Sequence, residues 1–190
     1  MIDGRLALAV LVLLAVAWYL SWTATRLDRL HTRVEGARAT LDAALARRSA
    51  AAGQLATSGL LDPASALVLA DAAHEARTAP AEEQELRQAD LSRVLRATLD
   101  EEDAGGGADV VPALTADPQG RALLTELAVA CHRATLARRF HNDAVAAARV
   151  VRAKRVVRWA HLAGRAPLPT TFETDDDLPP PLLALAVAAP

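Results

Sequence analysis

An uninterrupted apolar run from Leu6 to Leu20, closed by Trp22, limits the fold more than any other part of this sequence. No turn signal separates the run from the helical pattern of Thr23 to Thr57 that follows it. A segment this apolar is stable in hydrocarbon only if it satisfies its own backbone hydrogen bonds, as a helix does. The sequence therefore predicts a transmembrane anchor over residues 1–22 that continues directly into a long helix.

The apolar run is close to the lower length limit of a membrane span. At the helical rise, Leu6 to Trp22 extends over about 26 Å, against about 30 Å for a hydrocarbon core. Trp18, Tyr19 and Trp22 crowd its far end, and such amphipathic rings favour the headgroup level of a bilayer. The run therefore has the aromatic boundary expected of a membrane span.

A cleaved signal peptide is the alternative interpretation of the run. Ala15-Val16-Ala17 offers a small-x-small cleavage pattern after an apolar core. Against cleavage, the segment before the run carries only Arg5, which Asp3 offsets, and apolar character continues beyond Ala17. We therefore favour an uncleaved anchor.

The charges on either side of the run predict its orientation. Arg26, Arg29 and Arg33 follow the run, whereas Arg5 and the amino terminus precede it. Cytoplasmic flanks of membrane helices carry the excess of basic residues. The prediction is a single-pass protein of the cell membrane with its C-terminal domain in the cytoplasm.

Length and composition favour a single domain after the anchor. Removal of the anchor leaves about 165 residues, an ordinary size for one domain. The formal net charge of the chain is -2, so no global basic field favours nucleic acid. Cys131 is the only cysteine, and inside an alanine-rich helix we expect it to be a small buried apolar group.

The long first helix carries an apolar stripe that needs a partner helix. Its residues alternate in steps of three and four, the spacing of a seam between packed helices, and only Arg48 interrupts them. The stripe consists of Leu27, Leu30, Val34, Ala37, Leu41, Ala44, Ala51 and Leu55. Ser58-Gly59 marks the end of this helix.

Two further helices follow, each with a start or stop signal. Asp62-Pro63 predicts an N-cap followed by proline at the first helical position, and Pro80 ends that helix after Ala79. A third helix is expected from about Glu82 to Leu99. The acidic, glycine-rich segment 100–107 that follows predicts a mobile loop.

Asp117-Pro118 predicts the start of a fourth helix, which we expect to continue to Ala163 and to pack antiparallel against the first. Its stripe comprises Leu123, Leu127, Ala130, Ala134, Ala137, Ala144, Ala148 and Val151. The predicted fold is all-α: the transmembrane helix continues into an elongated antiparallel bundle of about four helices with coiled-coil-like packing. The predicted domains are the anchor (1–22), the bundle (23–166) and a Pro/Asp-rich mobile tail (167–190). Helices with such alanine-rich stripes can pack together within one chain or between two copies of the chain, so a homo-oligomer is an alternative to a monomer.

The most basic segment of the chain lies near the end of the fourth helix. It surrounds Trp159 and contains Arg149, Arg152, Lys154, Arg155, Arg158 and Arg165. In an antiparallel hairpin this cluster lies near Arg26 and Arg29, where each cation close to an anionic leaflet contributes about 1 kcal/mol of attraction. A solvated helix face is the equally weighted alternative, whereas nucleic acid is disfavoured because no recognisable nucleic-acid module accompanies the charges.

No residues converge in a catalytic pattern. His141, Asn142 and Asp143 are successive helical positions about 100° apart, so their side chains diverge. Cys131 and His132 diverge in the same way. The sequence contains no Cys/His pair at the spacing of metal ligands, no phosphate-binding loop motif and no serine-elbow motif. We therefore expect no metal, no cofactor and no enzymatic activity, with a membrane-bound hydrolase using His141, Asp143 or Glu126 as the less favoured alternative.

Several segments resemble the LemA family in order and context. They are Asp42-Ala43-Ala44-Leu45-Ala46-Arg47-Arg48 with Gln54-Leu55, then Leu91-Ser92-Arg93-Val94-Leu95, then Ala137-Arg138-Arg139-Phe140-His141-Asn142-Asp143-Ala144-Val145, and finally Leu162-Ala163-Gly164 with Pro167 and Phe172-Glu173. The most specific element is the motif Ala137-Arg138 with Asn142, Asp143, Ala144 and Val145. The chain is identified as a divergent bacterial member, of actinobacterial type.

The resemblance implies a short N-terminus outside the cell, one membrane helix and a cytoplasmic antiparallel bundle. It implies no particular enzymatic activity. His141 stands where the family usually has tyrosine, and residues 49–53 replace a segment that is normally richer in acidic and large aliphatic residues.

The expected function is that of a membrane-anchored structural or protein-interaction module with membrane lipids and an unidentified protein as partners. An anionic-lipid sensor built on residues 149–165 is the alternative. In the tail, the apolar stretch Leu182 to Ala189 suits either a short helix against the bundle or membrane, or a binding peptide.

Overall fold

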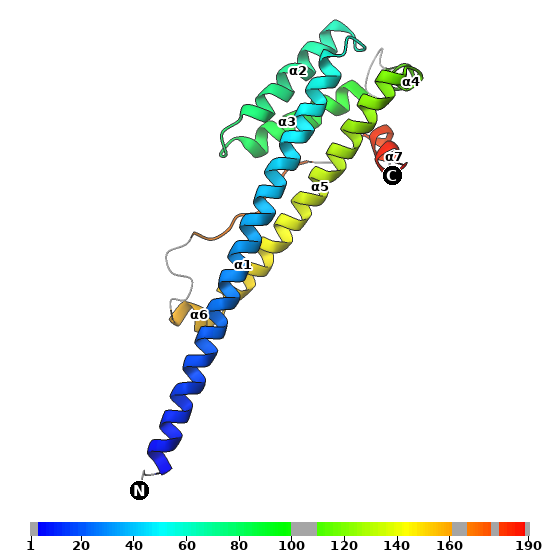
Figure 1. The fold of residues 1–190 in the computed structure, drawn as a ribbon. Helices are drawn as coiled ribbons and strands as arrows, with labels where there is room; N and C mark the ends of the chain where they lie inside the picture. Colours follow the sequence, from blue (N-terminus) through cyan, green and yellow to red (C-terminus); the bar gives the residue numbers. More distant parts are fainter. Residues whose placement is uncertain (1–3, 100–109, 161–166, 176–178, 189–190) are drawn as a thin grey trace. The chain divides into compact units, whose positions relative to one another are not determined.

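The computed structural model describes residues 4–99, 110–160, 167–175 and 179–188 (Figure 1). These residues form helices and connecting segments without strands, which confirms the all-α fold class. The helices are α1 (Gly4–Thr57), α2 (Pro63–Thr78), α3 (Gln84–Leu99), α4 (Val110–Ala116), α5 (Pro118–Arg152), α6 (Arg155–Trp159) and α7 (Pro180–Ala188). The predicted loop 100–107 and the motif Leu162-Ala163-Gly164 lie outside the described residues.

The chain divides into two compact units, and helices α1 and α5 each contribute residues to both. One unit comprises Met1–Arg38 and Phe140–Thr171, and the other comprises Ala39–Arg139 and Phe172–Pro190. Each unit has apolar cores of its own.

Helix α1 is continuous over 54 residues, as the absence of a turn signal predicted. It ends at Thr57, where Ser58 donates its hydroxyl to the Leu55 carbonyl over 2.7 Å. Gly59 then adopts a φ of 77°, a left-handed conformation that glycine takes without a steric penalty. The Ser58-Gly59 stop signal therefore acts where the sequence places it.

In the first unit, the core joins α1 to the end of α5 and to α6. Leu27, Val151 and Val157 are buried together, with 2%, 4% and 1% of their surface exposed, and Leu30 packs against them. The predicted continuous helix to Ala163 is wrong, because α5 ends at Arg152. Lys154 has extended backbone angles, and this turn lets α6 bring Val157 into the core.

The second unit holds the largest core, to which six helices contribute. Leu55 of α1 and Leu127 of α5 are fully buried in it. The other large members are Leu69 from α2, Leu91, Leu95 and Leu99 from α3, Val111 and Leu114 from α4, Leu124 from α5, and Leu182 from α7. Figure 1 shows α2 and α3 side by side.

Within this second unit, α1 and α5 run antiparallel, as predicted. A smaller cluster contains Leu41 and Leu45 of α1 with Ala134 and Ala137 of α5. Further along α1, Leu55 shares the main core with residues earlier in α5. The residue numbers therefore rise along one helix while they fall along its partner.

Both predicted aspartate-proline starts are confirmed. The Asp62 carboxylate accepts hydrogen bonds from the amides of Ala64 and Ser65, each over 3.0 Å. Hydrogen bonds from the hydroxyl and amide of Ser65, together with that of Ala64, lower the pKa of the Asp62 carboxyl. Asp117 caps α5 similarly, since the Gly120 amide donates to Asp117 Oδ2 over 2.7 Å.

Helix α4 was not predicted, and Gly120 shows how closely it approaches α5. A Cβ built at Gly120 meets the backbone carbonyl oxygen of Leu114, and the Leu114 Cα lies 3.1 Å from it. Only a residue without a side chain fits there. The early glycine in the fourth predicted helix therefore allows α4 to pack over the beginning of α5.

The C-terminal part is extended over its described residues 167–175 and then forms α7. Phe172 is fully buried with Leu41, Leu45, Ala134 and Ala137. Leu182 of α7 is buried in the main core, and Leu185 and Ala186 pack against it. Of the alternatives for the apolar end of the tail, the structure shows the short helix packed on the bundle.

Candidate functional site

The segment predicted to span a membrane is exposed on all sides of α1. Leu6 and Trp22 have 60% and 54% of their surface exposed, and Leu20 is half-buried. The large exposed apolar side chains between them are Leu8, Val10, Leu11, Val12, Leu13, Leu14, Val16, Trp18 and Tyr19. A helix that is apolar all round needs hydrocarbon or another protein around it.

By length and composition, α1 is apolar and long enough to cross a membrane, and it is the one such helix among the described residues. A signal sequence near an N-terminus has the same properties. The structure therefore shows an apolar helical segment that is capable of spanning a membrane. The same helix, α1, continues without interruption and contributes residues to both compact units.

Aromatic rings and arginines meet at the end of this apolar segment. The rings of Tyr19 and Trp22 are 6.4 Å apart, and the guanidinium carbon of Arg26 lies 5.7 Å from the Trp22 ring centroid. A shallow hollow follows this face of α1, lined by Trp18, Ser21, Trp22, Thr25, Arg26 and Arg29. Aromatic rings beside cations suit the headgroup level of a bilayer.

The predicted basic cluster separates into two groups. Arg149 donates from Nε to the Pro169 carbonyl over 2.8 Å, and Arg152 donates to the Pro167 carbonyl over 2.7 Å. These two arginines hold the extended C-terminal segment. The other group, on α6 and the turn before it, is exposed and contains Lys154, Arg155, Arg158 and Trp159. Arg165 lies outside the described residues.

The residues of the family-like motif have mostly structural positions in α5. Ala137 is buried beside Phe172. Ala144 and Val145 are buried, Arg138 and Asn142 are partly buried, and Asp143 is exposed. The motif thus provides small packing positions at regular helical spacing.

His141 is buried against the extended C-terminal segment. Its side chain is 2% exposed, and Nε2 lies 3.2 Å from the Thr170 carbonyl. A carbonyl oxygen only accepts, so this contact requires Nε2 to carry a proton. The contact of His141 is thus with the extended segment rather than with another helix. Asp143 is exposed while His141 is buried, and the two do not form an acid-base pair.

A buried polar cluster in the second unit was missed by the sequence reasoning. Arg48 is 4% exposed and donates from Nη2 to the Ser92 hydroxyl over 2.6 Å. Ser92 Oγ in turn lies 2.6 Å from the Asp175 carbonyl. Gln88 donates to Ser49 Oγ and to the Ala76 carbonyl over 3.3 and 3.2 Å.

This polar cluster links α1, α2, α3 and the C-terminal segment. Its signals in the sequence were the interruption of the α1 stripe by Arg48 and the polar Gln88 and Ser92 beside the buried leucines of α3. The Asp175 carboxylate also pairs with Arg96 over 2.6 Å, which attaches the segment to α3 a second time.

Cys131 is buried, as the sequence predicted. Burial raises the pKa of its thiol, and the neighbouring Arg48 guanidinium opposes this effect. A thiolate is the nucleophilic form, so a raised pKa disfavours nucleophilic chemistry. Among the described residues, no group of His, Cys, Asp and Glu side chains is arranged to hold a metal ion.

The buried polar cluster predicts an unusual response to mutation. Arg48 has no carboxylate partner within the described part of the chain, and its Nε lacks a hydrogen bond. Arg48→Met is therefore expected to leave the free energy of unfolding unchanged or to raise it by up to about 3 kcal/mol. Urea unfolding followed by circular dichroism measures this change. The control is Arg47→Met at the adjacent exposed position; a loss above about 1 kcal/mol for Arg48→Met alone would show that the guanidinium stabilises the fold.

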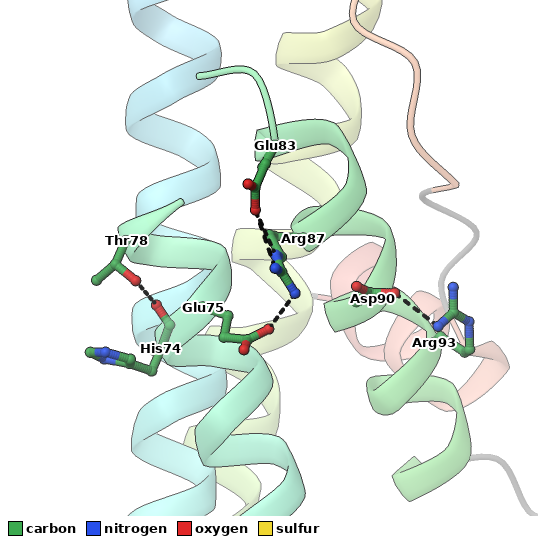
Figure 2. A network of polar contacts seen from close by, with 7 residues as sticks. All are labelled: His74, Glu75, Thr78, Glu83, Arg87, Asp90 and Arg93. Atoms are coloured by element: carbon green, nitrogen blue, oxygen red, sulfur yellow. Dashed lines mark hydrogen bonds and ion pairs between the residues drawn. The ribbon is translucent and has the colours of Figure 1, made fainter. Parts of the chain in front are cut away.

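The polar side chains on the surface of α2 and α3 form ion pairs and are not arranged as a candidate catalytic site (Figure 2). Arg87 pairs with Glu75 over 2.8 Å and with Glu83 over 3.2 Å, which raises the pKa of Arg87. Arg93 pairs with Asp90 over 2.8 Å. These pairs are solvent-exposed, and such pairs contribute little to stability.

Comparison with protein-family models, curated proteins and solved structures finds no match to this chain. The LemA resemblance therefore stays a prediction that rests on its sequence motifs.

Proposed function

We propose that this chain is a single-pass membrane protein whose helical domain acts as a structural or protein-interaction module at the cytoplasmic face. The observation that supports the proposal is the exposed apolar surface of α1 from Leu6 to Tyr19. The same uninterrupted helix contributes Leu41, Leu45 and Leu55 to packed cores. A core-forming helix with such an exposed apolar end is suited to hold a folded domain at a membrane.

Sidedness and family form part of the proposal. Arg26, Arg29 and Arg33 are exposed just beyond the apolar segment, which favours a cytoplasmic domain by the bias of basic residues toward that side. The LemA resemblance, with the same topology, supports this orientation. We propose membership of that family on these grounds.

Protein interaction is favoured over catalysis by the environment of the candidate catalytic groups. His141 is engaged with Thr170, whereas Asp143 and Glu126 are exposed. We propose a binding surface near the beginning of α2, where large apolar side chains are exposed. Leu60, just before α2, is 38% exposed, and Leu67 and Val68 within α2 are 73% and 55% exposed. In-membrane crosslinking from position 67, read by mass spectrometry, identifies a protein partner or a second copy of the chain.

Deletion of residues 1–22 tests the proposal directly. The full chain is expected in the membrane fraction after alkaline carbonate washing, and the shortened chain is expected in the soluble fraction with a strongly helical circular dichroism spectrum. The cores named above contain no residue from the deleted segment, so the fold should survive. A full chain that is washed from membranes would contradict the anchor, and a coil spectrum for the shortened chain would contradict an independently folded domain. Turnover of ester, phosphate or peptide substrates by the purified domain would instead support the hydrolase alternative.

A further inference from the structure

We propose that α6 and the turn before it form a basic foot that binds anionic lipid headgroups beside the membrane helix. The basic foot consists of Lys154, Arg155, Arg158 and Trp159. The inference rests on the proposed membrane anchor and adds a specific lipid ligand to it. All residues of the argument belong to the same compact unit as the apolar segment of α1.

Helix α6 is held at a defined level along α1. Val157 of α6 is buried against Leu27. Leu27 lies about 8 Å beyond Trp22 along the helix axis. The headgroup layer on each side of a bilayer is about 5–8 Å thick. With Trp22 at the edge of the hydrocarbon, packing of α6 on Leu27 places the basic foot at the outer part of the headgroup layer.

The exposed surface of α6 and the turn before it combines a large aromatic ring with cations. Trp159 is 85% exposed, and Lys154, Arg155 and Arg158 are exposed around it. A solvated helix face accounts for the cations, but an exposed tryptophan of this extent leaves a large apolar ring in water. At a bilayer interface the ring and the cations are both favoured. A lipid surface therefore satisfies the whole face of α6.

The two arginines just before the foot have partners within the protein. Arg149 and Arg152, at the end of α5, bond to the carbonyls of Pro169 and Pro167. They fix the extended segment, while the cations of the foot are left facing outward. The foot belongs to the same compact unit as Arg26 and the aromatic rings of α1, and α6 packs through Val157 on Leu27, the residue after Arg26. This shared location favours a lipid occupant over a soluble acidic partner.

Single-tryptophan variants of the full chain test the inference, since the chain has only three tryptophans. Trp18→Phe with Trp22→Phe leaves Trp159 as the reporter. Trp18→Phe with Trp159→Phe leaves Trp22 as the reporter of the anchor. Both are reconstituted into vesicles of phosphatidylcholine alone or with phosphatidylglycerol. In each case a fraction of the phosphatidylcholine carries bromine atoms near the headgroup end of its chains, where they quench nearby indole rings.

Trp22 is expected to be quenched in both vesicle types, and Trp159 severalfold more strongly in vesicles that contain phosphatidylglycerol. Each cation near an anionic surface changes the docked-to-undocked ratio about fivefold. Charge reversal by Lys154→Glu, Arg155→Glu and Arg158→Glu should thus lower this ratio by at least about 100-fold and remove the quenching of Trp159. The matched control reverses the exposed Arg47, Arg133 and Arg139 and should leave the quenching unchanged.

The outcomes separate the foot from the anchor. Quenching of Trp22 without quenching of Trp159 overturns the foot and keeps the anchor. Equal quenching of Trp159 in both vesicle types overturns the recognition of anionic lipid. Absence of quenching at both tryptophans overturns the anchor and the foot together. Loss of Trp159 quenching in the control variant as well would show a general charge effect and would also overturn the foot.

Discussion

Arginines at positions 13 and 14 are expected to transfer the protein from the membrane fraction to the soluble or aggregated fraction. Each Leu→Arg change at the centre of a membrane helix costs about 3 kcal/mol on insertion scales, so the pair costs about 6 kcal/mol, or roughly 10⁴-fold in insertion. Leu13 and Leu14 are 68% and 65% exposed in the structure. They contribute nothing to the described cores, and the helical spectrum of the domain should therefore be unchanged.

The matched control for this pair is Leu67→Arg with Val68→Arg on α2, where the side chains are 73% and 55% exposed. It introduces the same charges outside the apolar segment, and the protein should stay in the membrane fraction. Membrane fractionation with carbonate washing measures both variants. Retention of the Leu13→Arg, Leu14→Arg protein in washed membranes would refute a spanning role for the apolar segment of α1.

Phe172→Ala is expected to lower the free energy of unfolding of the helical domain by about 3–5 kcal/mol. The Phe172 ring is fully buried among Leu41, Leu45, Ala134 and Ala137, where the small alanines leave space for it. Alanine at 172 creates a cavity between α1 and α5 and weakens the attachment of the C-terminal segment. Urea unfolding followed by circular dichroism measures the loss as a lower midpoint with an unchanged slope.

Leu168→Ala is the control on the same extended segment, because Leu168 is 63% exposed. Its expected cost is within about 0.5 kcal/mol, as for other exposed positions. Equal effects of the two substitutions would mean that Phe172 is not packed between α1 and α5 in solution. The described core around Phe172 would then be wrong.

The parts of the fold that the sequence predicted depend on local signals. The uninterrupted α1, the caps at Asp62 and Asp117, and the stop at Ser58-Gly59 each follow from residues within a few positions of the element that they start or end. The antiparallel pairing of α1 with α5 followed from two matching apolar stripes. Such patterns can be recognised in a single sequence because each residue affects the helix to which it belongs.

The missed parts depend on contacts between distant residues. The turn at Lys154 has no proline or glycine, and it is favoured because Val157 gains a place against Leu27. Phe172 stands in a proline- and aspartate-rich tail whose composition predicts an extended chain but not the cavity that the ring fills. The Arg48 cluster joins residues that are 44 positions apart, as Arg48 and Ser92 are. Periodicity marks Arg48 as an interruption of the α1 stripe, but it does not identify Ser92 as its partner.

The contact between Asp175 and Ser92, 83 positions earlier, can form only after the C-terminal segment has been synthesised. Phe172 and Leu182 leave the ribosome after the residues of α1, α3 and α5 that they cover. Domains mostly assemble as units once their residues have emerged. The leucines that Phe172 and α7 cover are therefore accessible in the nascent polypeptide until Phe172 and α7 have emerged, and a product terminated before Phe172 would present them to chaperones and proteases.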